Sequence, residues 1–205
     1  MGIAKAIVIT GTPGVGKSTI ARMLAEELGA CLIELGDLVV EKGLYMGLDE
    51  ERASLIVDTR ALATEVAKML SGDQEHSLFI VVSHYAQDVV PKEAVLMAFV
   101  LRRSPYELKR VLAERGYGER KIIENVQAEV LDVCLVEALE TYGPGLIYEV
   151  DTTGRAPEDV ISEMLQAIEK GAGGRVGVVD WLGVLERDGR LEEFFPLEAG
   201  PSRSV

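Results

Sequence analysis

An eight-residue motif near the N-terminus constrains the fold of this chain more than any other feature. It reads Gly11-Thr12-Pro13-Gly14-Val15-Gly16-Lys17-Ser18 and matches the pattern G-x-x-x-x-G-K-[ST] at every fixed position. The β-branched run Ala4–Thr10 before it predicts a strand, and the apolar spacing of Lys17–Leu28 after it predicts a helix. In such a turn successive backbone N–H groups can surround a phosphate, with the positive end of the helix behind them. The motif therefore predicts a phosphate-binding loop for a nucleotide.

The residues of this loop have distinct predicted roles. We expect the Lys17 ammonium to reach the β- and γ-phosphates and the Ser18 hydroxyl to bind Mg²⁺. Thr19, in the first turn of the helix, is expected near the α-phosphate. The residues that supply backbone to the same site are Gly11, Gly14, Val15 and Gly16.

Strand-like and helix-like hydrophobic patterns alternate along the rest of the chain. The predicted strands are Ala4–Thr10, Cys31–Leu35, Leu78–Val82, Val95–Leu101 and Leu146–Val150. The predicted helices are Lys17–Leu28, Gly36–Glu41, Glu50–Leu70, Tyr106–Arg115, Glu119–Tyr142 and Pro157–Lys170. This alternation predicts an α/β fold in which helices cover both faces of a parallel five-stranded sheet.

The pattern changes after residue 170. Residues 1–170 are predicted to form one domain. The glycine-rich residues 171–177 predict a linker. Residues 178–198 contain Trp181 and several other apolar residues, which predict a small appendage docked on the domain. Residues 199–205 are predicted to be disordered.

The charge of the chain is strongly acidic but unevenly distributed. The 34 acidic and 21 basic residues give a formal net charge of −13, which argues against extensive direct binding of nucleic acid. Seven basic and only three acidic residues lie between Arg102 and Lys121. Arg102 and Arg103 follow a predicted strand, at the sheet edge where ligands bind in open α/β folds. For Lys109 and Arg110 a solvated helix face is the simpler interpretation.

The sequence shows neither a secretory signal nor a membrane-spanning segment. We therefore expect a cytoplasmic protein with no membrane partner. Cys31 and Cys134 are far apart and form no C-x-x-C pair, so neither a disulfide framework nor a zinc site is indicated. Cys134 is interpreted as a buried thiol.

The phosphate loop alone does not choose between a GTPase, an ATPase motor and a small-molecule kinase. We find no N-K-x-D motif for guanine, and the length does not favour a motor with a coupling domain. A nucleoside monophosphate kinase needs an acceptor arm after the first helix, arginines that neutralise the transferred phosphate, and a lid that excludes water. Each has a candidate segment here, and the lid candidate surrounds Arg115-Gly116-Tyr117-Gly118.

Further motifs accompany the phosphate loop. They are Gly36-Asp37-Leu38 with Tyr45, Gly47 and Asp49-Glu50-Glu51, then Val100-Leu101-Arg102, Arg115-Gly116-Tyr117 and Asn125-Val126-Gln127-Ala128-Glu129. With the loop, these stretches resemble the adenylate kinase family known in eukaryotes as adenylate kinase isoenzyme 6, which has archaeal members and doubles as a ribosome-assembly factor. The R-G-Y sequence followed by N-x-Q-x-E is particular to this family.

The resemblance implies an ATP- and Mg²⁺-dependent nucleoside monophosphate kinase with AMP as the first acceptor to expect. It implies that the loop and Arg115 bind ATP, and that Lys17 and Arg115 are catalytic. An acceptor arm is expected at residues 34–57, with Gly36 and Asp37 near the acceptor phosphate or the waters of the metal ion, and a lid at residues 114–124. We also assign Arg102, at its strand end, to the acceptor. The resemblance further implies a protein of the small-ribosomal-subunit platform as a partner, and a role in late maturation of that subunit.

One departure from the family concerns the end of the third predicted strand, where the family carries an Asp-x-His pair. The chain reads Val82-Ser83-His84-Tyr85, so His84 matches the histidine and no carboxylate matches the aspartate. An alignment on Asp88 instead sets Ser83 against the aspartate and Tyr85 against the histidine. His84 is kept as a catalytic candidate, with a structural role as the alternative.

The departure weakens the case for ATPase activity in particular. Two other functions stay open as alternatives to the adenylate kinase reaction. One is an ATPase-gated assembly factor with little kinase activity, and the other is a kinase for a different small acceptor.

Overall fold

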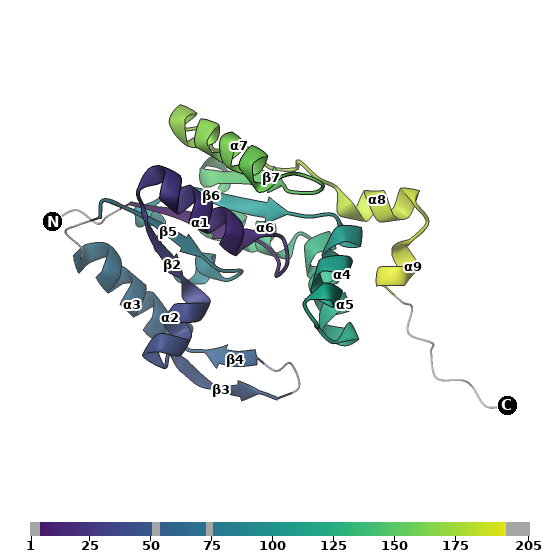
Figure 1. Cartoon of the computed structure of the whole chain (residues 1–205), viewed down its shortest axis with the longest axis horizontal. Coiled ribbons are helices and arrows are strands. Elements are labelled where there is room, and N and C mark those ends of the chain that lie inside the picture. Colours follow the sequence, from purple (N-terminus) through teal and green to yellow (C-terminus); the bar gives the residue numbers. More distant parts are fainter. Residues whose placement is uncertain (1–4, 51–53, 73–75, 196–205) are drawn as a thin grey trace.

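The structure is a computed structural model that describes residues 5–50, 54–72 and 76–195. A five-stranded parallel sheet with the strand order β2-β5-β1-β6-β7 forms its centre (Figure 1). The strands are β1 (Lys5–Thr10), β2 (Cys31–Glu34), β3 (Tyr45–Asp49), β4 (Ser54–Val57), β5 (Leu78–Val82), β6 (Val95–Arg102) and β7 (Ile147–Asp151). The predicted α/β fold is confirmed. The predicted disorder of residues 199–205 lies outside the described residues, as do the last residues of the predicted appendage.

The helices lie on both faces of this sheet and at its C-terminal edge. They are α1 (Lys17–Leu28), α2 (Leu35–Lys42), α3 (Thr59–Gly72), α4 (Pro105–Glu114), α5 (Glu119–Val130), α6 (Val133–Tyr142), α7 (Pro157–Lys170), α8 (Trp181–Arg187) and α9 (Leu191–Phe194). None of the helices in the described part of the chain is long and apolar enough to cross a membrane.

Successive residues of β1 point to opposite faces of the sheet, as the two-residue period of a strand requires. Ile7 and Ile9 belong to a core that also contains residues of α1, α4, α5 and α7. Ala6 and Val8 belong to a second core with residues of α2, α3 and α6. All four side chains are at most 1 % exposed. The central strand is therefore buried on both faces, which explains its continuous apolar sequence.

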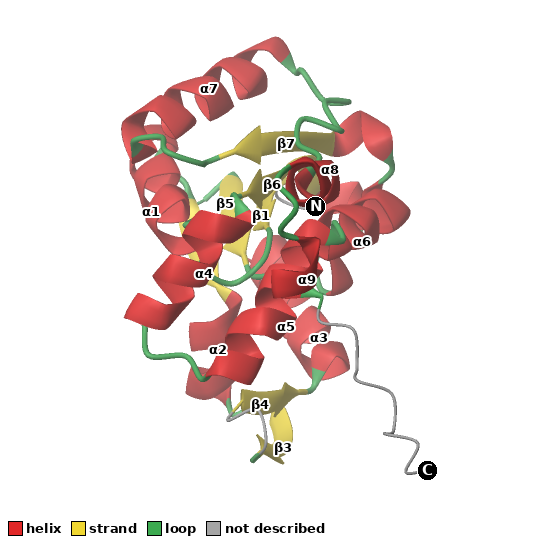
Figure 2. Cartoon of the chain, turned by 90° about the vertical axis from the view of Figure 1, so that its right-hand side faces the viewer, coloured by secondary structure: helices red, strands yellow, loops and turns green. Residues whose placement is uncertain are grey.

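Residues 178–195, with α8 and α9, pack beside α4 and α5, and we call this segment the appendage (Figures 1 and 2). Trp181, Leu185 and Phe194 of the appendage are buried in the same core as α4 and α5. The segment predicted as a linker runs along the outer edge of β7. There the Glu149 N–H donates to the Arg175 carbonyl at 2.8 Å, so this segment extends the hydrogen bonding of the sheet.

The helix predicted over Glu50–Leu70 is wrong in its first part. Strand β4 occupies that part and pairs with β3 in an antiparallel hairpin. Leu55 and Val57 pack toward the second core, whereas Ile56 between them is 45 % exposed, which is the alternation of a strand. Helix α3 begins only after Asp58, whose carboxylate accepts a backbone N–H three residues later at 3.0 Å.

The helix predicted over Glu119–Tyr142 is divided in two at Asp132. This residue has a φ of 58°, a left-handed conformation that cannot continue an α-helix. Its carboxylate pairs with the guanidinium of Arg102. Two features together explain the break between α5 and α6. Aspartate tolerates this conformation, and Asp132 forms the long-range ion pair.

The close approach of Gly11 to β6 can be tested by substitution of the glycine. Gly11 has a φ of +135°, and a Cβ there would lie 2.4 Å from the Leu101 carbonyl oxygen. We expect Gly11→Ala to lower the free energy of unfolding by about 1–3 kcal/mol or more, because the backbone must shift or strain. Denaturant unfolding of the purified protein measures the change.

The matched control is Gly36→Ala. Gly36 lies within α2, and a Cβ at this position would meet nothing within 4 Å. Since alanine favours a helix over glycine by roughly 0.5–1 kcal/mol, this variant should be as stable as the parent protein or more stable. Equal stability of the two variants would contradict the interpretation of Gly11.

Candidate functional site

Residues with polar and charged side chains come together at the carboxyl ends of the parallel strands. The phosphate loop follows β1, Glu34 ends β2, His84 follows β5, Arg102 ends β6 and Thr152 follows β7. Ligands of open α/β sheets bind at this edge, near the point where the strand order changes direction. Because β1 is the central strand, the phosphate loop lies in the middle of this row.

The phosphate loop leads directly into α1. Its last glycine, Gly16, has a φ of 102°, and α1 begins at Lys17. Within the described residues no side chain caps the first turn of α1. The first backbone N–H groups of a helix have no partner inside the helix, so they are available to an anion. This end of α1 therefore fits a phosphate group.

Three hydrogen bonds hold the loop from outside. Thr12 Oγ1 donates to Glu129 Oε2 at 2.6 Å, Arg103 Nη1 donates to the Gly14 carbonyl at 3.4 Å, and Thr152 Oγ1 donates to the Val15 carbonyl at 3.2 Å. The partners come from α5 and from the ends of β6 and β7. A loop held by several elements needs little reorganisation when it binds an anion.

One pocket, which we call the Lys17 pocket, has a volume of about 410 Å³. Its lining residues are Pro13, Lys17, Ser54, His84, Tyr117, Lys121, Glu124 and Asn125. They come from the phosphate loop, the β3–β4 hairpin, the end of β5, and the region of α5 and the turn before it. The Lys17 pocket thus lies where the predicted acceptor arm and the predicted lid both face the loop.

Lys17 places its ammonium group over the backbone of the loop. Its Nζ donates to the carbonyl oxygens of Gly11 at 2.6 Å and Thr12 at 3.0 Å. Burial lowers the pKa of Lys17 to about 8. The group is therefore mostly charged at neutral pH and can attract a phosphate in the Lys17 pocket.

His84 lines the same pocket as an uncharged side chain. Partial burial, together with the ammonium groups of Lys17 and Lys121, lowers its pKa to about 4. Its backbone is held by the buried side chain of Gln87, whose Nε2 donates to the His84 carbonyl at 3.0 Å. At neutral pH His84 can donate or accept hydrogen bonds, but it adds no positive charge. Its catalytic role stays a prediction.

A second pocket borders the loop, and we call it the arginine pocket. It has a volume of about 270 Å³ and is lined by Val15, Gly16, Thr19, Ile20, Arg103, Arg115, Thr152, Arg155, Pro157 and Val160. Arg115 is close enough to Lys17 to contribute to the lowering of the pKa of Lys17, after the larger effect of burial. Three guanidinium groups beside the backbone of the loop suit a ligand with several phosphates.

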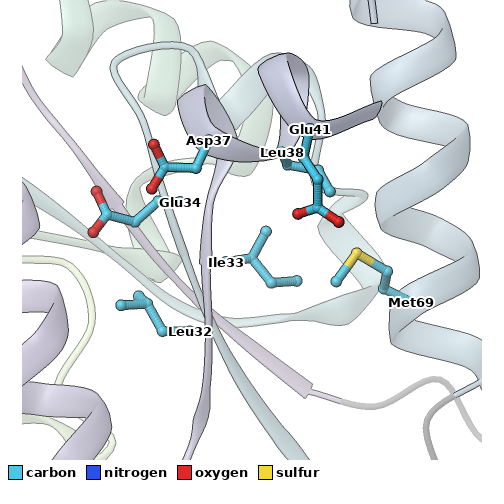
Figure 3. A pocket seen from close by; sticks show the side chains of 7 residues that line it. All are labelled: Leu32, Ile33, Glu34, Asp37, Leu38, Glu41 and Met69. Atoms are coloured by element: carbon cyan, nitrogen blue, oxygen red, sulfur yellow. The ribbon is translucent and has the colours of Figure 1, made fainter. Parts of the chain in front are cut away.

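Ser18 and Glu34 provide oxygen atoms beside the loop. Ser18 Oγ donates to Glu34 Oε2 at 2.8 Å, and Arg22 Nη2 donates to Glu34 Oε1 at 2.6 Å. The carboxylates of Glu34 and Asp37 lie next to each other at the rim of a further pocket of about 270 Å³, with Glu41 on its other side (Figure 3). Hydroxyl and carboxylate oxygens are ligands that Mg²⁺ prefers.

This set of residues fits a Mg²⁺ ion shared with a bound phosphate. Within the described ranges, no group of three or more His, Cys, Asp and Glu side chains could hold a metal ion. Mg²⁺ usually keeps several waters and takes its other ligands from one or two protein groups and the phosphates of the substrate. Ser18 is the residue that would bind the ion, with Glu34 within hydrogen-bond distance of Ser18.

The predicted acceptor residues Gly36 and Asp37 lie in the first turn of α2, and both are exposed. Asp37 lines the pocket beside Glu34, as described above. Their contact with an acceptor stays a prediction.

The structure corrects the prediction for Arg102. Its side chain is 2 % exposed, and its guanidinium pairs with Glu129 at 2.8 Å, with Glu149 at 2.6 Å and with Asp132. Burial disfavours the charge, but the carboxylates of Glu129 and Asp132 raise the pKa of Arg102 above its usual value. Because every nitrogen of the guanidinium already donates to a buried partner, Arg102 supports the site from inside and does not reach a ligand.

Several residues of the site have no role assigned from the sequence, among them Glu34, Glu129, Thr152 and Arg155. Glu34 and Arg155 each follow or end a parallel strand, which is a signal that could have identified them. Glu129 is the last residue of the N-x-Q-x-E motif, but its contact with Thr12 joins positions 117 residues apart, which no local pattern indicates.

The pKa of Lys17 predicts how nucleotide binding depends on pH. We expect the affinity for Mg·ADP to be nearly constant between pH 6.5 and 7.5 and to fall as the pH rises through about 8, by up to tenfold per pH unit. The sign follows because the protonated form of Lys17 attracts phosphate and the deprotonated form does not. Isothermal titration calorimetry from pH 6.5 to 9.5 measures the dissociation constant.

His84→Gln is the control, because the low pKa of His84 leaves that side chain uncharged over this pH range. The decrease above pH 8 should persist in this variant. An affinity that stays constant up to pH 9.5 in the parent protein would contradict the assignment of the lowered pKa to Lys17.

Comparisons with known proteins agree with this geometry. Residues 7–132 match a family model described as an AAA domain. A protein of Pyrococcus furiosus named "Putative adenylate kinase" is 43 % identical over 180 residues, which cover 88 % of this chain and 93 % of that protein. A protein of the same name from Methanocaldococcus jannaschii is 38 % identical over 175 residues, covering 85 % of this chain and 92 % of that protein.

Two solved structures share the fold at low sequence identity. A gluconokinase from Sinorhizobium meliloti aligns with a TM-score of 0.52 and 16 % identity, covering 83 % of this chain and 94 % of that one. A thymidylate kinase from Candida albicans aligns with a TM-score of 0.52 and 18 % identity, covering 84 % and 94 % of the two chains. The fold is therefore that of the P-loop kinases.

Proposed function

Since the chain belongs to the family of archaeal P-loop proteins that carry the name "Putative adenylate kinase", we propose that it transfers the γ-phosphoryl group of ATP to a nucleoside monophosphate, with AMP as the preferred acceptor. The proposal places the chain among the nucleotide kinases. It also names AMP as the acceptor for the phosphotransferase activity that the fold supports.

The observation that carries the proposal is that two separate pockets meet at one phosphate loop. Gly16 and Thr19 line the arginine pocket, and Pro13 and Lys17 line the Lys17 pocket. A reaction between two phosphorylated substrates needs such an arrangement, with the donor on one side of the loop and the acceptor on the other. We assign the donor ATP to the arginine pocket and the acceptor monophosphate to the Lys17 pocket.

The reaction needs correct positions and charge neutralisation, with no covalent intermediate. An oxygen of the acceptor phosphate forms a bond to the γ-phosphorus, the bond from that phosphorus to the β,γ-bridging oxygen breaks, and its electron pair leaves with ADP. Lys17 and Arg115 neutralise the charge on the transferred group from the two pockets. Ser18 would hold Mg²⁺, which would further neutralise the charge of the bound phosphates.

The end of β5 itself supplies no strong base for hydrolysis of ATP. Attack by water is assisted by a base that accepts its proton. Val82 and Ser83 provide no carboxylate at this strand end, and the low pKa of His84 makes its imidazole a weak base.

The role in maturation of the ribosomal small subunit that the resemblance implies stays a prediction.

An acceptor assay tests the proposal. We expect ADP to form from Mg·ATP when AMP is present, with ADP appearing at twice the rate at which AMP disappears. ATP without an acceptor is the control, and CMP, UMP and GMP measure the breadth of the acceptor site. ATP turnover that is indifferent to every monophosphate would exclude a nucleoside monophosphate kinase and favour the ATPase alternative.

The role of Arg115 gives a second test. Arg115→Ala is expected to lower kcat by about 100- to 1,000-fold, because a positive charge that faces the transferred phosphate is lost. Arg110→Ala is the matched control, since Arg110 lies five residues earlier, is exposed and lines neither pocket. Removal of this surface charge should change kcat by no more than about twofold. Similar losses of kcat in the two variants would show that the effect comes from the net charge of the protein and not from the position of Arg115.

A further inference from the structure

The C-terminal appendage reaches the interior of the site through Trp181. This is the only tryptophan of the chain, it is 7 % exposed, and it begins α8. Its indole Nε1 donates to Glu129 Oε1 at 3.2 Å. The appendage therefore contributes a polar contact to a buried carboxylate, in addition to its apolar packing.

Glu129 connects this contact to the phosphate loop. Its second oxygen, Oε2, accepts the hydrogen bond from Thr12 Oγ1 at 2.6 Å. The carbonyl of Thr12 in turn accepts a hydrogen bond from Lys17 Nζ at 3.0 Å. Trp181, Glu129, Thr12 and Lys17 thus form one continuous series of hydrogen bonds from the appendage to the catalytic ammonium.

The other donors to Glu129 are part of the body of the protein. Arg102 Nε donates to Oε1 at 2.8 Å, and the Arg103 N–H donates to Oε1 at 3.1 Å. Both groups belong to the end of β6, whereas Trp181 approaches from the appendage. A second contact of this kind joins the Val178 N–H to Glu149 Oε2 at 2.8 Å, so the appendage also completes the hydrogen bonding of the neighbouring buried carboxylate.

The appendage also contacts both helices that flank the turn at Arg115. Tyr106 Oη in α4 donates to Asp188 at 2.7 Å, and Gln127 Nε2 in α5 donates to the Phe194 carbonyl at 2.7 Å. Figure 2 shows α9 beside α4 and α5 in this position. The appendage is therefore attached to the elements that carry residues of both pockets.

We infer that Trp181 is a positioning residue of the nucleotide site, which orients the Glu129 carboxylate and thereby holds Thr12 and Lys17 of the phosphate loop in place. The inference rests on the proposed function for the identity of the donor nucleotide. The competing explanation is that Trp181 only covers the apolar core, as Leu185 and Phe194 do. The two explanations differ in what happens when the indole N–H is removed and the aromatic ring is kept.

Trp181→Phe makes this change, and Tyr106→Phe is its matched control. Each variant removes one hydrogen bond of the appendage and keeps an aromatic ring, but the Tyr106 bond to Asp188 has no connection to Glu129. Loss of one such bond in the series should raise the dissociation constant of Mg·ADP by about three- to tenfold in Trp181→Phe. Tyr106→Phe should leave this constant unchanged, because the ion pair between Lys109 and Glu193 still holds the appendage on α4. Calorimetric titration with Mg·ADP and thermal unfolding of the full chain measure binding and stability separately.

Thr12→Val tests the other end of the series and remains informative if Trp181→Phe does not fold. It should weaken Mg·ADP binding by a similar factor. Because the two contacts act in series through Glu129, the double variant should bind no more weakly than the weaker single variant. Effects that multiply in the double variant, unchanged binding in Thr12→Val, or equal weakening in Trp181→Phe and Tyr106→Phe would each overturn the inference.

The kinetic readout separates this inference from the proposed function. With AMP as the acceptor, Trp181→Phe should raise KM for ATP and change kcat less. If the parent protein shows no AMP-dependent turnover, the proposed function fails, while the Mg·ADP titrations still test the role of Trp181.

Discussion

The buried guanidinium of Arg102 is the contact on which the arrangement of the site depends. It pairs with the carboxylates of Glu129 and Glu149, which are 2 % and 0 % exposed. Buried charges persist only when they are paired, and removal of one partner costs on the order of 3–5 kcal/mol. Because the three side chains come from β6, α5 and β7, their pairing sets the position of α5 relative to the strand ends. The phosphate loop depends on it in turn, since Glu129 also holds Thr12.

The cations of the basic segment 102–121 lie in several different parts of the structure. Arg102 points into the protein, and the next residue, Arg103, lines the arginine pocket. Lys109 pairs with Glu193 of α9 at 2.9 Å, and Lys121 lines the Lys17 pocket. The basic segment is therefore distributed over the interior, two pockets, the appendage contact and, with Arg110 and Arg120, the exposed surface. Cations concentrated in pockets attract phosphates locally, so a net charge of −13 does not oppose nucleotide binding.

Local signals in the sequence are sufficient to predict the phosphate loop and the five parallel strands. A strand–glycine–helix pattern specifies the loop, and continuous apolar runs specify the strands. The same signals do not predict the β3–β4 hairpin. The spacing of apolar residues in that segment also suits a helix, and the core against which the strand packs is formed by helices distant in the sequence. Local signals also fail for Arg102, whose carboxylate partners Glu129 and Glu149 lie 27 and 47 residues away. Sequence spacing shows that a charged residue ends a strand, but its partners decide whether it faces the ligand or the interior.

The turn between α4 and α5 serves both pockets at once. Arg115 lines the arginine pocket and Tyr117 lines the Lys17 pocket, and Gly116 between them has a φ of 76°. A left-handed residue at this position reverses the direction of the chain after α4, so the two neighbouring side chains face different pockets. Any displacement of this turn therefore changes the arginine pocket and the Lys17 pocket together. Since the appendage is bonded to both α4 and α5, its contacts restrict displacement of the turn. This restriction matters because phosphoryl transfer depends on the relative positions of fixed charges.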